Sequence, residues 1–170
     1  MTKQRHHYRA LKYALIFVLV MYVFYFAFKY FHIALVKQPT PSMPEGYYLT
    51  YPAFALKNGD NVLFYPDAKT EALIVKRHWL PEHVTLLKKI VGVPGDHLCI
   101  KDQKVYINGR LQALVWKHDE KGHPLPVFRY CGKIKQGDYF VEGVADPRSF
   151  DSRYYGLVSR QQIISKAVKI

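Results

Sequence analysis

Serine and lysine residues at separate places in this sequence could together carry out nucleophilic chemistry. Ser42 lies six residues after the one apolar stretch that is long enough to cross a membrane. A serine hydroxyl is a poor nucleophile until a neighbouring base removes its proton. Two adjacent lysines, Lys88 and Lys89, and a second serine, Ser149, follow later in the chain. This order of hydroxyl, amine and hydroxyl suits a serine that is activated by a lysine and could attack peptides emerging from a bilayer.

The two lysines interrupt an apolar strand, Leu86-Leu87-Lys88-Lys89-Ile90-Val91. Neighbouring side chains of a strand point to opposite faces, so we expect one lysine to face the interior and the other to face solvent. Burial disfavours the charged amine and lowers its pKa, which leaves a neutral fraction able to accept a proton. The alternative is two solvated lysines that protect an edge strand from aggregation.

Histidine, the more usual base, has no distinctive position here. Of the eight histidines, three lie in or before the apolar stretch and five lie in polar segments. His78 and His83 are close enough in sequence to suggest a metal site, but Pro81 between them would break a helix that aligned them. We therefore expect these histidines to be surface residues, and the sequence predicts no metal site.

Residues 13–36 are predicted to form a single transmembrane anchor. Lys29 is the only charged residue between positions 14 and 36, and a helix of that length reaches roughly 34 Å, enough to cross a hydrocarbon core. A cleaved secretory signal is the alternative, but no small-x-small cleavage site follows Val36. Aromatic residues crowd the end of the stretch, so the hydrocarbon span could end near Phe28, with residues 30–36 among the headgroups.

Charge predicts the orientation and the partners. Lys3, Arg5, Arg9 and Lys12 precede the span, and no acidic residue occurs before Glu45. The positive-inside rule therefore predicts a cytoplasmic tail at residues 1–12 and a domain outside the membrane at residues 37–170. The net charge of +12 divides equally between residues 1–44 and 45–170, and the surplus of six on the outer part suits an anionic lipid surface. No nucleic-acid-binding motif accompanies the charge, so we expect no nucleic-acid partner.

Residues 37–170 read as one mainly β, antiparallel domain. Short strands are expected at residues 62–65, 84–93, 105–107 and 138–141, and Asn108-Gly109 is a strong hairpin signal. Short helices are expected at residues 69–75 and 160–166, and the three prolines of residues 38–44 suggest a stiff linker. Cys99 and Cys131 could form a disulfide outside the membrane or remain two buried thiols.

Three motifs resemble those of the signal peptidase I family, and they occur in that family's order behind an N-terminal anchor. The first, Ser42-Met43-Pro44, resembles the nucleophile motif and is weak alone. The second resembles the general-base motif, and the third resembles the last family motif; both are specific. They read Lys88-Lys89-Ile90-Val91-Gly92-Val93-Pro94-Gly95-Asp96 and Ser149-Phe150-Asp151-Ser152-Arg153-Tyr154-Tyr155-Gly156.

The resemblance implies a role for each matching residue. Ser42 would be the nucleophile and Lys88 the general base. Thr40 would help the Ser42 N–H to form the oxyanion hole, and Ser149 would hold the lysine by a hydrogen bond. Two further positions, Asp151 and Arg153, would brace the site.

Two departures from the family pattern also stand out. Gly143-Val144-Ala145 replaces the usual Gly-Asp-Asn, and Lys89 replaces an arginine. Together they predict that an ion pair found in common members is absent. The sequence from Pro147 to Tyr154 and the compact size resemble the conjugative-transfer, TraF-like branch.

The resemblance implies a signal-peptidase-like barrel or sandwich and a Ser–Lys serine endopeptidase that needs no cofactor. Its partners would be exported preproteins, such as pilin precursors, at the periplasmic side of the bacterial inner membrane. A general signal peptidase I is the alternative within the enzyme class. A non-catalytic adaptor of a secretion complex is the alternative from another class.

Overall fold

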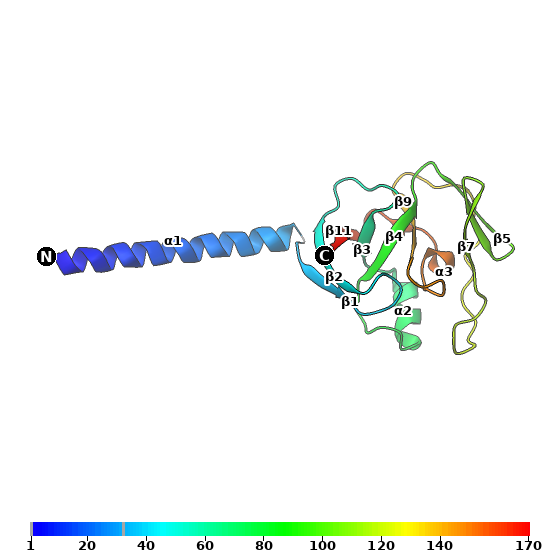
Figure 1. Ribbon diagram of the computed structural model, residues 1–170, viewed down its shortest axis with the longest axis horizontal. Helices are drawn as coiled ribbons and strands as arrows, with labels where there is room; N and C mark the ends of the chain where they lie inside the picture. The colour runs from blue at the N-terminus through cyan, green and yellow to red at the C-terminus, as the bar shows by residue number, and fades with distance from the viewer. Residues whose placement is uncertain (1, 32) are drawn as a thin grey trace.

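The computed structural model describes residues 2–31 and 33–170, in which a long helix projects from a β-domain (Figure 1). Helix α1 spans Thr2–Tyr30 and carries many exposed apolar side chains. Its segment His7–Tyr30, 24 residues, is long and apolar enough to cross a membrane, by length and composition. The helix thus begins earlier than the predicted anchor and ends at Tyr30. Residues 35 and 36, which were assigned to the anchor, belong to strand β1 instead.

The larger sheet has seven strands in the order β1-β2-β11-β3-β4-β9-β10. All of its neighbouring pairs are antiparallel. The bounds of its strands are Leu35–Gln38 for β1, Gly46–Pro52 for β2, Asn61–Phe64 for β3, Leu86–Gly92 for β4, Asp138–Glu142 for β9, Val158–Ser159 for β10 and Ile163–Lys169 for β11. The mainly β, antiparallel fold expected from the sequence is therefore present.

The smaller sheet has four strands in the order β7-β6-β5-β8 and lies at the far side of the domain from α1 (Figure 1). Its strands are His97–Lys101 for β5, Lys104–Ile107 for β6, Arg110–Leu114 for β7 and Cys131–Lys133 for β8. Asn108 and Gly109 make the tight turn between β6 and β7 with φ of 51° and 78°. Positive φ at both positions is what a two-residue hairpin of this type requires, so the predicted hairpin is confirmed.

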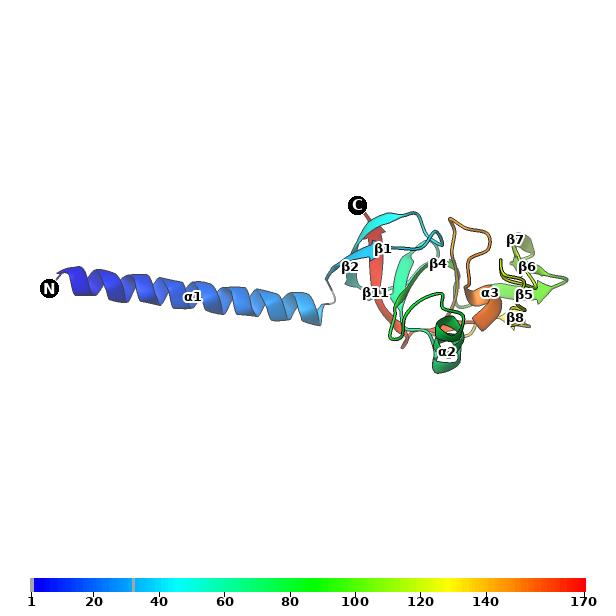
Figure 2. The same cartoon turned by 90° about the horizontal axis from the view of Figure 1, so that it is seen from below.

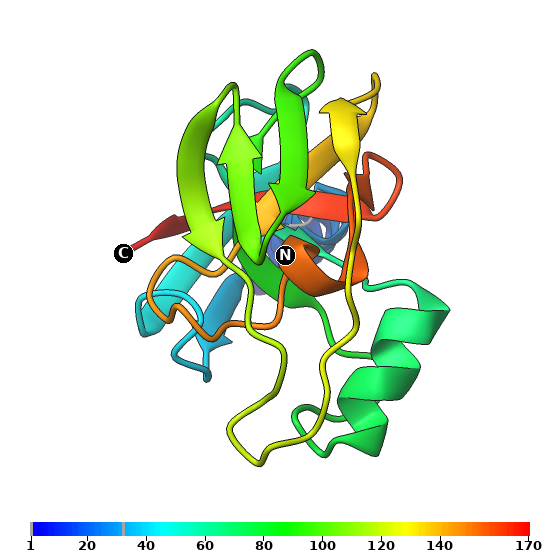
Figure 3. The ribbon, with the colours of Figure 1, turned by 90° about the vertical axis from the view of Figure 1, so that its right-hand side faces the viewer.

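A disulfide joins Cys99 of β5 to Cys131 of β8, which are directly paired in the sheet. Of the two states that the sequence left open, the structure has the bonded one. Figure 3, which views the domain from the side opposite α1, shows this sheet in front of the larger one.

Two short helices pack beside the larger sheet (Figure 2). Helix α2, Ala68–Lys76, confirms the helix expected at residues 69–75, and Asp67 caps it by accepting a hydrogen bond from the Thr70 N–H at 2.7 Å. Helix α3, Ser152–Tyr155, follows an Asp151 cap and was not foreseen.

Two local predictions are wrong. Residues 160–166 do not form a helix, because Ile163–Lys169 is a strand between β2 and β3, and its Ile163, Ser165 and Ala167 residues are buried. Residues 38–44 are not a stiff linker between the anchor and the domain either. Gln38 pairs with Gly46, so the proline-rich segment is the loop of the β1–β2 hairpin.

Apolar side chains between the layers form the core. The largest cluster gathers Val62, Phe64, Ile90 and Val141 from strands β3, β4 and β9. A second cluster, which includes Leu98, Val105 and Phe140, joins the two sheets. Strand β4 contributes to both clusters, so its side chains are shielded on both faces of the sheet.

Candidate active site

Strand β4 places Lys88 inside the domain. The strand lies between β3 and β9, and its side chains alternate between two faces. Lys88 is only 4 % exposed, whereas Lys89 is half-buried. The prediction that one of the two lysines faces the interior is thus confirmed, and the buried one is Lys88. Its ammonium donates a hydrogen bond to Ser149 Oγ at 2.6 Å.

Burial lowers the pKa of Lys88 to about 8. Loss of hydration is the main cause; the Asp151 carboxylate opposes it by favouring the charged form, and the Arg153 guanidinium adds to it. At pH 7 about a tenth of the Lys88 amines are then neutral, compared with fewer than one in a thousand for an ordinary lysine. The amine can therefore act as a base near physiological pH.

The loop of the β1–β2 hairpin carries Ser42. Its hydroxyl lies 3.1 Å from Thr40 Oγ1 and 3.4 Å from the Gln38 amide nitrogen. The Ser42 carbonyl accepts a hydrogen bond from the Ala145 N–H at 3.2 Å, which ties this loop to the segment after β9. The Met43 side chain next to Ser42 is buried in an apolar cluster, and this contact fixes the loop to the sheet.

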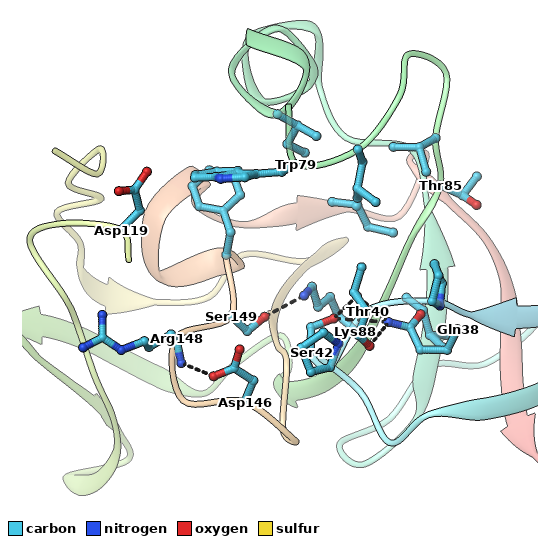
Figure 4. Close-up of a pocket in the computed structure, with 18 of the residues that line it drawn as sticks. Gln38, Thr40, Ser42, Trp79, Thr85, Lys88, Asp119, Asp146, Arg148 and Ser149 are labelled. Carbon is cyan, nitrogen blue, oxygen red and sulfur yellow. Dashed lines mark hydrogen bonds between the residues drawn. The ribbon is translucent and has the colours of Figure 1, made fainter. Parts of the chain in front are cut away.

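Ser42 and Lys88 face the same pocket, which has a volume of about 510 Å³. Figure 4 shows Lys88 reaching from its strand into the space between Ser149 and the turn that carries Thr40 and Ser42. Within the described residues, no hydrogen bond joins Ser42 Oγ to Lys88 Nζ. In unliganded sites catalytic hydrogen bonds are often long and shorten when substrate binds.

A buried ion pair holds Ser149 in place. Asp151 is fully buried and accepts hydrogen bonds from Arg153 Nε and Nη2, each at 2.8 Å. Arg153 Nη2 also donates to the Ser149 carbonyl at 3.0 Å, and Nη1 donates to the Pro147 carbonyl at 2.8 Å. The guanidinium thus anchors the backbone that presents the Ser149 hydroxyl to Lys88.

Comparison with known proteins gives the family. The signal peptidase family, peptidase S26, matches residues 6–170. The chain belongs to this family. A plasmid transfer protein TraF from Escherichia coli is 33% identical over 144 residues, which cover 74% of this chain and 76% of that protein. A probable signal peptidase I-2 from Synechocystis is 32% identical over 113 residues, which cover 65% of this chain and 46% of that protein.

The chain thus spans about half the length of one of these two relatives and three quarters of the other. Among solved structures, a signal peptidase I from Enterococcus faecalis matches with a TM-score of 0.40 and 22% identity, covering 66% of this chain and 96% of that one.

In this member of the signal peptidase family, all six residues singled out for catalysis or its support lie in one region. Ser42, Lys88 and Thr40 line the pocket together with Ser149. Arg153 and Asp151 lie directly behind Ser149. Arg153 donates a hydrogen bond to the Ser149 carbonyl, and Asp151 accepts one from the Gly143 N–H. The disulfide lies in the smaller sheet, and neither of its cysteines lines the pocket.

Gly143 is a site residue that the motif comparison noted only as a departure. A Cβ at this position would collide with Ser149 Oγ and would come within 2.8 Å of the Ser42 carbonyl oxygen. Its N–H donates to Asp151 Oδ2 at 2.9 Å. Gly143 therefore sets how closely the Ser42 loop approaches Ser149, and a glycine directly after a buried strand was its signal in the sequence.

Glu142, the residue before Gly143, is a buried carboxyl that sequence reasoning missed. Burial raises its pKa to about 7, although a hydrogen bond from Gln112 at 3.1 Å opposes the rise. Its second carboxyl oxygen has no partner among the described residues. Glu142 is paired across the sheet with Lys89, the neighbour of Lys88, and does not line the pocket.

The pocket continues from Ser42 toward α2 and the loop after β7. Apolar side chains from the end of α2 and the segment after it, together with Phe150, cover this part; they include Trp79, Leu80 and Val84. Trp79 and Phe150 are in ring contact, with centroids 5.0 Å apart. Figure 4 shows Trp79 across the pocket from Ser42 and Lys88.

Proposed function

We propose that the chain is a membrane-anchored serine endopeptidase that cleaves the signal or leader peptides of exported preproteins, with Ser42 as nucleophile and Lys88 as general base. The observation that carries the proposal is the buried Lys88 amine, bonded to Ser149 and facing the pocket of Ser42. A depressed lysine pKa beside a serine hydroxyl suits nucleophilic catalysis.

The first chemical step forms an acyl-enzyme. Neutral Lys88 accepts the Ser42 hydroxyl proton while Ser42 Oγ attacks the carbonyl carbon of the scissile bond. Negative charge develops on the carbonyl oxygen, where the Thr40 hydroxyl and the Ser42 N–H donate hydrogen bonds. The Ser42 N–H has no protein acceptor among the described residues, so it is available for this role. The C–N bond then breaks, and Lys88 passes its proton to the leaving amine.

The second step releases the acyl group. Lys88, neutral again, takes a proton from a water molecule, whose oxygen attacks the Ser42 ester. The ester bond breaks, and the proton returns to Ser42 Oγ. Ser149 keeps the Lys88 amine in position during both steps by accepting a hydrogen bond from it. A substrate amine in place of water would join two peptide ends.

The likeness to TraF supports a substrate of the conjugative-transfer apparatus, such as a pilin precursor. Helix α1 and the basic residues at its start support an anchor in the bacterial inner membrane, with residues 37–170 on the periplasmic side. The likeness to signal peptidase I proteins supports a second candidate, a general signal peptidase that processes many exported proteins.

The test uses the full chain in lipid vesicles with a pilin precursor and, separately, a generic secretory preprotein, and products are weighed by mass spectrometry. Ser42→Ala and Lys88→Met should each abolish cleavage while circular dichroism shows a folded protein. Lys89→Met is the matched control and should keep most of the activity. Cleavage by Ser42→Ala would refute the proposal. Evidence that the chain is an adaptor without catalytic function would refute it as well. Equal rates on both substrates would favour the general signal peptidase.

A further inference from the structure

Gln38 lines the pocket beside the Ser42 loop and has no role in the reaction as described so far. It is the last residue of β1, its backbone is paired with Gly46 of β2, and its side chain is only 7 % exposed. Its amide nitrogen lies 2.8 Å from the Thr40 carbonyl oxygen and 2.7 Å from Thr40 Oγ1. The same nitrogen lies 3.4 Å from Ser42 Oγ.

These contacts fix the orientation of the Gln38 amide. The Thr40 carbonyl oxygen can only accept a hydrogen bond, so the Gln38 atom beside it must be the NH2 nitrogen and not the oxygen. That nitrogen carries two hydrogens. One points to the Thr40 carbonyl, and the geometry directs the other to Thr40 Oγ1.

The Gln38 contacts also favour one direction for the hydrogen bond between Thr40 and Ser42. Because Thr40 Oγ1 accepts from Gln38, its own single proton points elsewhere. Ser42 Oγ, 3.1 Å away, is the acceptor within reach. In the arrangement where Thr40 donates, Ser42 Oγ accepts from Thr40 and its own proton is free to be donated to Lys88.

We infer that Gln38 is a positioning residue that sets the direction of the Thr40 proton, and through it the direction in which Ser42 releases its own proton. This inference rests on the proposed function. In the resting site the Thr40 proton is directed at Ser42 Oγ. During attack, the same proton turns to the oxygen on which charge develops. Without Gln38, the Thr40 hydroxyl could donate to the wrong partner, such as a backbone carbonyl.

A double-mutant cycle with Gln38→Leu and Thr40→Val tests the inference, using the full chain in vesicles and the better of the two precursors. Thr40→Val should lower kcat by about 100-fold, the usual loss for one oxyanion donor. Gln38→Leu should lower kcat by about tenfold with KM nearly unchanged, because it acts on Thr40 and not on the substrate. The double variant should be no slower than Thr40→Val alone.

Gln162→Leu is the matched control. Gln162 also bonds to backbone and side-chain groups, at Ser159 and Tyr65, but it does not line the pocket. Its replacement should leave kcat unchanged. If Gln38→Leu destabilises the fold, Gln38→Glu, which has the same shape, replaces it. A carboxylate would draw the Thr40 proton toward itself, so this variant should lose at least as much kcat.

Three outcomes would overturn the inference. One is wild-type kcat in Gln38→Glu or in a folded Gln38→Leu. Another is a double variant whose loss equals the product of the two single losses. The third is a Gln38→Leu effect confined to KM. Each of these leaves the proposed function intact as long as Ser42→Ala is inactive, whereas an active Ser42→Ala removes the proposed function itself.

Discussion

The two sheets of the domain differ in the polar groups that they bury. The seven-stranded sheet and the segment after β9 contain the buried charged residues Lys88, Glu142, Asp151 and Arg153. Among the described residues of the four-stranded sheet, every buried side chain is apolar, and a disulfide crosslinks two of its strands. Burial of charge costs stability but shifts pKa values, which chemistry requires. The comparison indicates that the proposed chemistry depends on the buried charged groups of one sheet, whereas the strands of the other sheet mainly contribute stability.

The largest effect should come from breaking the buried ion pair beside the seven-stranded sheet. Asp151→Asn keeps the shape but leaves the Arg153 guanidinium buried without its counter-charge, which should lower the free energy of unfolding by about 3–5 kcal/mol. Activity should fall with it, because Asp151 also holds the Gly143 N–H. Urea unfolding measures the change.

The control for that variant is Asp60→Asn. The Asp60 and Lys166 side chains are 11 % and 14 % exposed, more than those of the Asp151–Arg153 pair, so loss of this ion pair should cost less stability. A loss of equal size in the two variants would show that burial of the Asp151 pair has no special importance.

A smaller effect is expected from a methyl group at the meeting point of the Ser42 loop and Ser149. Gly143→Ala should lower kcat by about 100-fold, because the added Cβ pushes Ser149 and Ser42 apart. Gly132→Ala, in the four-stranded sheet, meets only an ordinary contact with Tyr130 at 3.9 Å and should be neutral. Normal turnover by Gly143→Ala would contradict this account of the site.

The pH dependence should reflect Lys88. Since its pKa is about 8 and the neutral form is the active base, kcat/KM should rise about tenfold per pH unit below pH 8 and level off above it. Rates measured between pH 6 and pH 10 test this. Glu142→Gln is the control, because Glu142 has a pKa of about 7. A midpoint near 7 that this substitution removes would assign the profile to Glu142.

The smallest effect on activity should come from the disulfide. Replacing both Cys99 and Cys131 by serine frees a loop that the bond closes over a sequence separation of 32, which should cost about 3–4 kcal/mol of stability. At temperatures where the variant remains folded, kcat should stay within about twofold of the wild type. A large loss of kcat in the folded variant would mean that the disulfide also holds the loop between β7 and β8, which lines the pocket, in its active position.

Strand alternation predicted that at most one of the two lysines would face the interior, because a period of two is a local property of the chain, but it left open the alternative of two solvated lysines. Assignment of that role to Lys88 came from motif resemblance, and the structure agrees with it. The helix predicted at residues 160–166 was wrong, since the burial of Ile163 and Ala167 depends on β2 and β3, which are distant in sequence.

Gln38 could not be found from the sequence. A glutamine four residues before a serine has no distinctive pattern, and its importance arises only when the hairpin turns its amide onto Thr40. Glu142 was missed for a related reason. From the sequence, a single acid after the apolar residues of β9 would be expected to face solvent. In the structure, the smaller sheet covers it, and Gln112 of that sheet donates a hydrogen bond to it.

Strand β11 lies between β2 and β3 and is hydrogen-bonded to both. It is therefore the link between the hairpin that presents Ser42 and the pair of strands that presents Lys88. Residues 163–169 are synthesised after every residue of the site, so the sheet cannot be continuous between these two halves of a nascent chain until this segment has emerged. Until this strand has been added, a nascent chain would thus lack a continuous sheet behind the proposed Ser42–Lys88 pair.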